Sequence, residues 1–197
     1  MNNAGSRTAR LTGTAILAAM VIVFDYALKY SGLKIPFPWM PVLKFDFTGI
    51  PIVVSLLLYG WPSSAFTSLA GTLGIVVRSG DLIGGAMKGV AEFSTAAGMA
   101  VGLYISRRTS LSGYAAKMLS VVIGLIFRIV VMSGWNLVIL PAYYGVPYDA
   151  AVGMLYPLGV FNSMQGAIST LLGYALYEAY TRRVPGAKAG PPGTTHT

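Results

Sequence analysis

Three carboxamide side chains interrupt the most apolar stretches of this sequence. Asn162 and Gln165 lie three residues apart in VFNSMQG, residues 160–166, and Asn136 lies in the preceding apolar stretch. Side chains three apart on a helix share a face. Because a carboxamide both donates and accepts hydrogen bonds, three of them could bind a neutral ring with polar edges. Hydrogen bonding between helices is the alternative, and the residues alone leave both open.

Charged side chains within these apolar stretches also require partners. Arg128 lies eight residues before Asn136, so the two share roughly one helix face. A charge inside a membrane costs at least about 2.5 kcal/mol. We therefore expect a structural ion pair, for which Glu92 is the best partner. We place Asp46 at the rim of a pocket near Asn136.

The sequence lacks the residues that most enzymes use. It has no cysteine, and its single histidine, His196, lies in a polar tail whose composition is typical of disorder. The stretches GTLG and GDLIGG lack the lysine of a phosphate-binding loop, and no two carboxylates stand at metal-binding spacing. We expect neither an enzyme nor a cofactor. The alternative from another class is an intramembrane enzyme or channel that uses Asp25, Glu92 and Arg128.

The composition is that of an integral membrane protein. Of 197 residues, 55% are hydrophobic and 10% are charged, whereas soluble domains carry about a quarter charged residues. The mean hydropathy is +0.66. The net charge of +8 comes from basic residues that flank apolar stretches, as the positive-inside rule expects. We therefore do not expect nucleic acid as a partner.

Six apolar stretches predict an all-α fold of six membrane-spanning helices. The expected spans are 11–28, 47–60, 63–77, 87–105, 115–140 and 159–180. Residues 1–10 would form a cytoplasmic N-terminal segment, residues 11–183 the membrane domain, and residues 184–197 a disordered cytoplasmic tail.

The distribution of basic residues places both termini in the cytoplasm. The side with the termini carries more of them: Arg7, Arg10, Arg107, Arg108, Lys117, Arg182, Arg183 and Lys188, against Lys29, Lys34, Lys44, Arg78 and Lys88. The outer side has the longer loops, at 29–45, 78–88 and 141–157, so a pocket would open outward. Phe37 and Trp39 in the first loop suit either the membrane interface or a lid over that pocket.

The first span contains the sequence AILAA, in which Ala15 and Ala19 lie four apart. Small side chains at this spacing let another helix approach closely. The pattern is compatible both with packing inside the chain and with contact to a partner protein.

Three ordered motifs resemble the substrate-binding S components of energy-coupling-factor (ECF) vitamin transporters, and the resemblance covers about residues 9–183. KFDFTGIP, residues 44–51, resembles the K-x-D-x-S-D-I-P stretch of the riboflavin-specific S components. FNSMQG resembles their F-N-x-x-K-G motif through Phe161, Asn162 and Gly166. A third pattern of that subfamily is matched by Arg128, Val131, Met132, Asn136, Leu140, Pro141 and Tyr143.

The resemblance implies a riboflavin-binding subunit of an ECF-type importer in the plasma membrane, with riboflavin as cargo. It implies a coupling subunit that contacts Ala15 and Ala19, together with two cytoplasmic ATPases. It also implies that Asn136 and Asn162 hydrogen-bond the isoalloxazine edge and that residues 29–45 gate the pocket. The other residues expected around the ligand are Trp39, Lys44, Phe45, Asp46, Tyr143 and Gln165.

Two positions depart from the pattern of the riboflavin-specific proteins. Gln165 stands where they usually have lysine, and Gly49 where they have aspartate. Glutamine still donates to a carbonyl, so riboflavin remains compatible with the site. The loss of a cation and an anion together leaves open another vitamin or a flavin-like ligand in the same fold.

Overall fold

The computed structural model describes residues 3–184, with side chains from residue 7 onward. Within these residues, six helices and one two-stranded hairpin make up the fold. In chain order they are α1 (Asn3–Tyr30), β1 (Ile35–Phe37), β2 (Met40–Phe45), α2 (Gly49–Tyr59), α3 (Trp61–Ser79), α4 (Leu82–Arg108), α5 (Gly113–Tyr144) and α6 (Tyr148–Arg183). Lys188, His196 and almost all of the expected tail lie outside the described residues.

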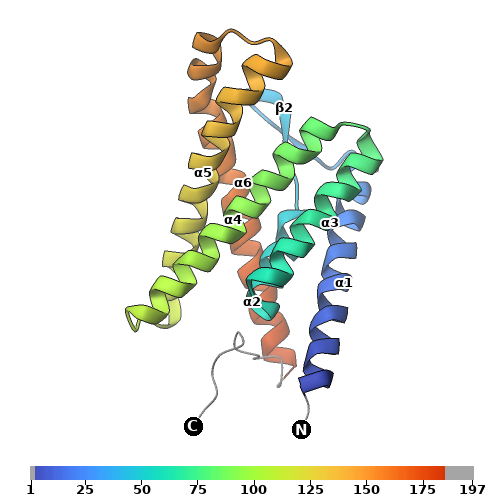
Figure 1. Ribbon diagram of the computed structural model, residues 1–197, viewed down its shortest axis with the longest axis vertical. Coiled ribbons are helices and arrows are strands. Elements are labelled where there is room, and N and C mark those ends of the chain that lie inside the picture. Colours follow the sequence, from blue (N-terminus) through green and yellow to red (C-terminus); the bar gives the residue numbers. More distant parts are fainter. Residues whose placement is uncertain (1–2, 185–197) are drawn as a thin grey trace.

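The helices run up and down, so that α1 begins and α6 ends at the same end of the bundle (Figure 1). The 11 residues of α2 span only about 16 Å. This short helix is nevertheless the centre of the fold, because it packs against α1, α3, α4 and α6. The hairpin β1–β2 leads into its first turn and lies at the opposite end from the chain termini.

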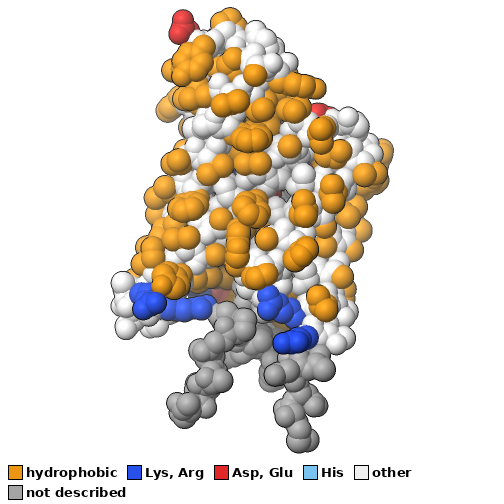
Figure 2. Space-filling view, in the orientation of Figure 1, with side chains coloured by type: hydrophobic (Ala, Val, Ile, Leu, Met, Phe, Trp, Pro, Cys, Tyr) orange, Lys and Arg blue, Asp and Glu red, His pale blue; other side chains and the backbone are white. Residues whose placement is uncertain are grey.

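The surface and the interior have the polarity expected for a protein in lipid. Hydrophobic side chains cover the middle of the visible face, while Lys and Arg side chains gather at its lower end (Figure 2). The buried positions, in contrast, are rich in serine and threonine, among them Ser63, Ser64, Thr67 and Thr95. Thr67 and Thr95 donate to carbonyls one turn earlier, whereas Ser64 donates to the carbonyl of Ile52 on α2 at 2.9 Å.

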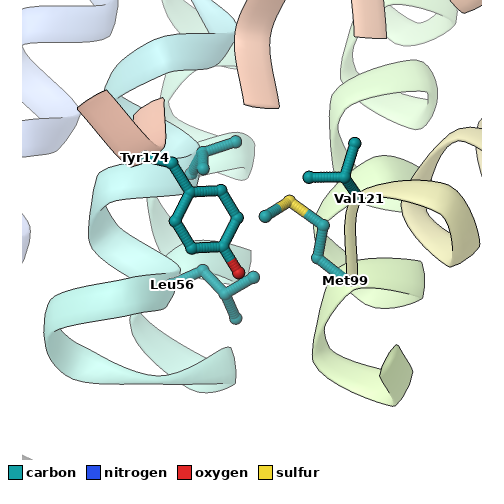
Figure 3. Packing of buried hydrophobic residues seen from close by; sticks show 5 residues of the cluster. Leu56, Met99, Val121 and Tyr174 are labelled. Carbon is teal, nitrogen blue, oxygen red and sulfur yellow. The ribbon is translucent and has the colours of Figure 1, made fainter. Parts of the chain in front are cut away.

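An apolar core cluster contains residues from four of the helices. Leu56 from α2, Met99 from α4, Val121 from α5 and Tyr174 from α6 meet in one buried cluster (Figure 3). The hydroxyl of Tyr174 lies 2.6 Å from Ser120 Oγ, so its polar tip is satisfied within the cluster.

Two of the described helices are long and apolar enough to cross a membrane by length and composition alone, over Arg7–Tyr30 and Gly113–Tyr144. The first of these lies near the N-terminus, where signal sequences pass the same test. α2 is apolar but shorter.

Two of the three expected outer loops are mostly helical. Residues 141–157 were expected to be a loop, but α5 runs through Pro141 to Tyr144 and α6 begins at Tyr148, with Pro157 inside it. A proline in a helix removes one hydrogen bond, and burial of Ala151 and Leu158 on either side of Pro157 keeps the helix intact. The expected loop 78–88 is likewise short, because Asp81 caps α4 by accepting a hydrogen bond from the Gly84 amide.

The expected loop 29–45 contains regular structure. β1 and β2 pair antiparallel, with Ile35 opposite Phe45 and Pro36 opposite Lys44. Prolines are tolerated in this hairpin because both strands are edge strands, so the missing N–H groups need no partner.

Helices α4 and α5 approach so closely that glycine is required between them. A Cβ atom at Gly102 would lie 2.6 Å from the Cα atom of Ser120. Gly134 on α5 has no such neighbour, since nothing lies within 4 Å of its Cβ position.

We predict that Gly102→Ala lowers the free energy of unfolding by about 1–3 kcal/mol, because the backbone of α5 must shift. Gly134→Ala is the matched control and should be neutral or stabilising by up to about 1 kcal/mol. Thermal unfolding in detergent, followed by loss of the monodisperse peak, measures both. Equal melting temperatures for the two variants would contradict the close approach.

Candidate functional site

The hairpin lies against α6 through an aromatic cluster. Phe161 of α6 packs against Phe45 and Phe37, with ring centroids 5.1 and 5.6 Å apart. Trp39, at the hairpin turn, stacks on Tyr156 one turn further up α6, with centroids 6.0 Å apart. Phe37 is buried and Trp39 is 58% exposed, so the hairpin buries one face on α6 and exposes its tip.

Both ends of the hairpin join a buried ionic cluster, which consists of Asp25, Lys34, Asp46, Arg78 and Lys88. Lys34 precedes β1 and its Nζ lies 2.6 Å from Asp25 Oδ1 and 3.9 Å from Asp46 Oδ2. Asp46 follows β2 and pairs with Lys88 of α4. Arg78 of α3 pairs with Asp25 of α1. The cluster thus ties the hairpin to three helices.

The charges of the ionic cluster shift the pKa values of its two loop members. Burial disfavours the ionised form of Asp46, but Lys88 and a hydrogen bond from Thr48 more than offset it, so the pKa of Asp46 lies below its usual range. Burial and the nearby Lys88 lower the pKa of Lys34, although Asp25 and Asp46 oppose this. Three cations face two carboxylates, so the cluster carries one excess positive charge when all five groups are ionised.

A second buried group surrounds Arg128 on α5. Its Nη1 atom lies 3.0 Å from Glu92 Oε1 and 3.1 Å from Thr95 Oγ1, both on α4. Its Nε atom donates to Asn162 Oδ1 on α6 at 3.1 Å. Arg128 and Glu92 are each 3% exposed, so the structure contains the expected ion pair and extends it to one of the carboxamides.

The three carboxamides are all buried but differ in what they bind. Asn162 Nδ2 donates to the carbonyl of Leu158 at 2.9 Å, which together with Arg128 engages both ends of this amide. Asn136 Nδ2 donates to the carbonyl of Met132 at 2.6 Å. Within the described residues, Asn136 Oδ1 accepts no hydrogen bond.

Gln165 binds the backbone of the hairpin end. Its Nε2 donates to the carbonyl of Asp46 at 2.9 Å, and its Oε1 accepts from the Asp46 amide at 3.2 Å. The pattern FNSMQG did not indicate this contact, since nothing in it points to a backbone segment 119 residues earlier in the chain.

Gly49 has no room for a side chain, because the carboxylate of Glu92 and the hydroxyl of Ser169 fill the adjacent space. A Cβ atom at Gly49 would lie 2.3 Å from Glu92 Oε2 and 2.3 Å from Ser169 Oγ. Glu92 therefore stands next to the position where the related pattern has an aspartate.

Several of the expected site residues are exposed rather than buried against the hairpin. Lys44 is exposed on β2, and Tyr143 is 61% exposed at the C-terminal end of α5, where its ring contacts Tyr144. Ala15 and Ala19 are exposed on α1, and so is Thr12 along the same face. No helix of the described chain therefore covers this small-residue face.

A cavity of about 520 Å³ opens between α3 and α4, with Phe66, Leu69 and Phe93 among its lining residues. None of the residues expected to bind the ligand lines it. Within the described residues, no group of three His, Cys, Asp or Glu side chains is placed to hold a metal ion.

We predict that Arg128→Met destabilises the protein by roughly 3–5 kcal/mol, because it leaves the Glu92 carboxylate buried without a counter-charge. Adding Glu92→Met should recover most of that loss. Arg182→Met is the control, since this side chain is 82% exposed. A double variant whose loss in melting temperature equals the sum of the single losses would contradict the pairing.

Comparisons with known proteins show a likeness to solved structures. No protein-family model matches the chain, and no curated protein matches it. A solved structure, of the S component of a bacterial ECF transporter, superposes with a TM-score of 0.73 at 21% sequence identity, over 90% of this chain and 98% of that one. The chain therefore has the fold of an ECF transporter S component.

Proposed function

We propose that this protein is the substrate-binding S component of an ECF-type importer and that it binds riboflavin. The observation that carries the proposal is the likeness in fold over nearly the whole of both chains. The riboflavin assignment rests on the motifs around Asp46, Asn136 and Asn162. The alternative ligand is another vitamin or a flavin-like ring, which Gln165 and Gly49 favour.

The arrangement of the outer half supports a ligand site beneath the hairpin. Asn136 Oδ1 is free to accept a hydrogen bond from a ring N–H. Asn162 is held in a fixed orientation by Arg128, and pre-orientation lowers the entropic loss on binding. Phe45 and Trp39 contribute aromatic surface from the hairpin. Asp46 and Gln165 bound the proposed ligand site on its inner side. In this proposal, Lys44 and Tyr143 approach the ligand from the rim.

The charge distribution supports a multi-pass protein in the plasma membrane with cytoplasmic termini. Of the cations on the proposed outer side, Lys34, Arg78 and Lys88 pair with the two carboxylates of the ionic cluster. Arg107, Arg108 and Arg183 at the other end are exposed. The support for cytoplasmic termini is therefore the count of basic residues, eight at the end with the termini against five at the other. In this proposal residues 11–183 form the membrane domain.

The exposed small-residue face of α1 supports a partner in the membrane. Ala15 and Ala19 lie on it, and small side chains permit close contact between helices in lipid. We propose that this face binds the transmembrane coupling subunit, which in turn carries two cytoplasmic ATPases.

We predict that protein purified without added ligand quenches riboflavin fluorescence stoichiometrically. Asn136→Ala and Asn162→Ala should each weaken binding by about tenfold or more, because each removes a hydrogen bond in a buried site. Ser163→Ala is the matched control, since its hydroxyl bonds only to the carbonyl of Gly159 within α6. A colourless protein that does not quench riboflavin fluorescence would refute the flavin assignment. A binding screen against a panel of vitamins would then identify the ligand.

We predict that Ala15→Trp and Ala19→Trp abolish co-purification with the coupling subunit, because a large side chain prevents close helix contact. Riboflavin affinity should stay unchanged. Leu171→Trp is the control, since Leu171 is 54% exposed on α6 and lies outside the proposed interface. Retention of the coupling subunit by both alanine variants would refute this interface.

A further inference from the structure

Helix α6 holds the hairpin at two positions one turn apart. Phe161 packs on the rings of Phe37 and Phe45. Gln165, four residues later, forms two hydrogen bonds with the backbone of Asp46. Ring packing tolerates sliding, whereas paired hydrogen bonds fix both distance and direction. Gln165 therefore sets the position of the hairpin more narrowly than the aromatic cluster does.

The contact between Gln165 and Asp46 continues the row of backbone hydrogen bonds beyond the end of β2. β2 ends at Phe45, so the Asp46 amide and carbonyl need another partner. A carboxamide presents one acceptor and one donor side by side, as a neighbouring strand would. Gln165 is 3% exposed, so water cannot readily replace it.

The excess positive charge of the ionic cluster favours a neutral side chain at position 165. Lys34, Arg78 and Lys88 already outnumber Asp25 and Asp46. A lysine at position 165 would add a fourth cation to this buried region, and it could not accept from the Asp46 amide. Glutamine forms both bonds without adding charge.

We propose that Gln165 is a positioning residue that fastens the hairpin to α6 and thereby sets how fast ligand enters and leaves. Asn162 lies between Phe161 and Gln165 in the sequence of α6, so the proposed ligand site lies next to both attachments. Opening the hairpin breaks the two Gln165 bonds. The ligand part of this inference rests on the proposed function, but the fastening itself does not.

Hydrogen exchange of the ligand-free protein tests the fastening directly. In Gln165→Leu, the amides of residues 35–46 should exchange at least about tenfold faster, because two buried hydrogen bonds are lost. Ser163→Ala, a change on the same helix that leaves the hairpin untouched, should exchange like the unmodified protein. Unchanged exchange in Gln165→Leu would overturn the proposal.

If Gln165→Leu does not fold, a second variant, Gln165→Glu, tests the same contact. In Gln165→Glu, the protonated carboxyl offers one acceptor and one donor, whereas the ionised form cannot donate to the Asp46 carbonyl. Hairpin protection should therefore be retained at acid pH and fall as pH rises. The charged groups nearby are Asp46, Lys88, Glu92 and Arg128, so the unmodified protein at each pH is the reference. Protection that follows the reference at every pH would overturn the proposal.

Binding kinetics separate this inference from the proposed function. If riboflavin binds, Gln165→Leu should raise its association and dissociation rate constants together by about tenfold, with a smaller change in Kd. A large loss of affinity with unchanged association would instead make Gln165 a direct ligand contact and overturn the positioning role. If riboflavin does not bind at all while hairpin exchange responds as stated, the fastening stands and the flavin assignment fails.

Discussion

The half of this fold that holds the hairpin depends on the pairing of charged side chains inside the bundle. A buried carboxylate or ammonium without a partner costs several kcal/mol, and in an apolar setting water cannot supply the partner. The ionic cluster satisfies Asp25 and Asp46 with cations from the loop before β1, from α3 and from α4. The separation of α1, α3 and α4 at this level is therefore fixed by side-chain reach as well as by packing. The same ion pairs also hold both ends of the hairpin, at Lys34 and Asp46, against these helices.

The proposed ligand site is built around polar groups that are already engaged. Asn162 is shared between Arg128 and its own helix, and Gln165 is shared with the hairpin. Such engagement satisfies buried amides when no ligand is present. In the proposed function, a ligand therefore replaces some of these hydrogen bonds with its own. Asn136 Oδ1 differs, because no described residue donates to it.

The sequence predicted the number of helices and the ion pair partner of Arg128, because both follow from local rules. A run of apolar residues long enough to span a membrane predicts a helix, and a lone buried cation requires an acid. The ends of the helices were harder to predict. Pro141 and Pro157 were interpreted as loop residues, but both lie inside helices, three residues before the end of α5 and nine residues after the start of α6. The contact between Gln165 and Asp46 could not be predicted, since it depends on the tertiary approach of the hairpin.

The close contact at Gly49 has a consequence for how related sequences can vary. The carboxylate of Glu92 and the hydroxyl of Ser169 occupy the space into which any side chain at position 49 would grow. A relative that carries aspartate at this position must therefore have a smaller or displaced side chain at position 92. In this chain the carboxylate next to Arg128 comes from Glu92 on α4, and an aspartate at position 49 would place one on α2 instead. Aligned sequences should accordingly show the two positions changing in concert, with the negative charge conserved and its helix of origin exchanged.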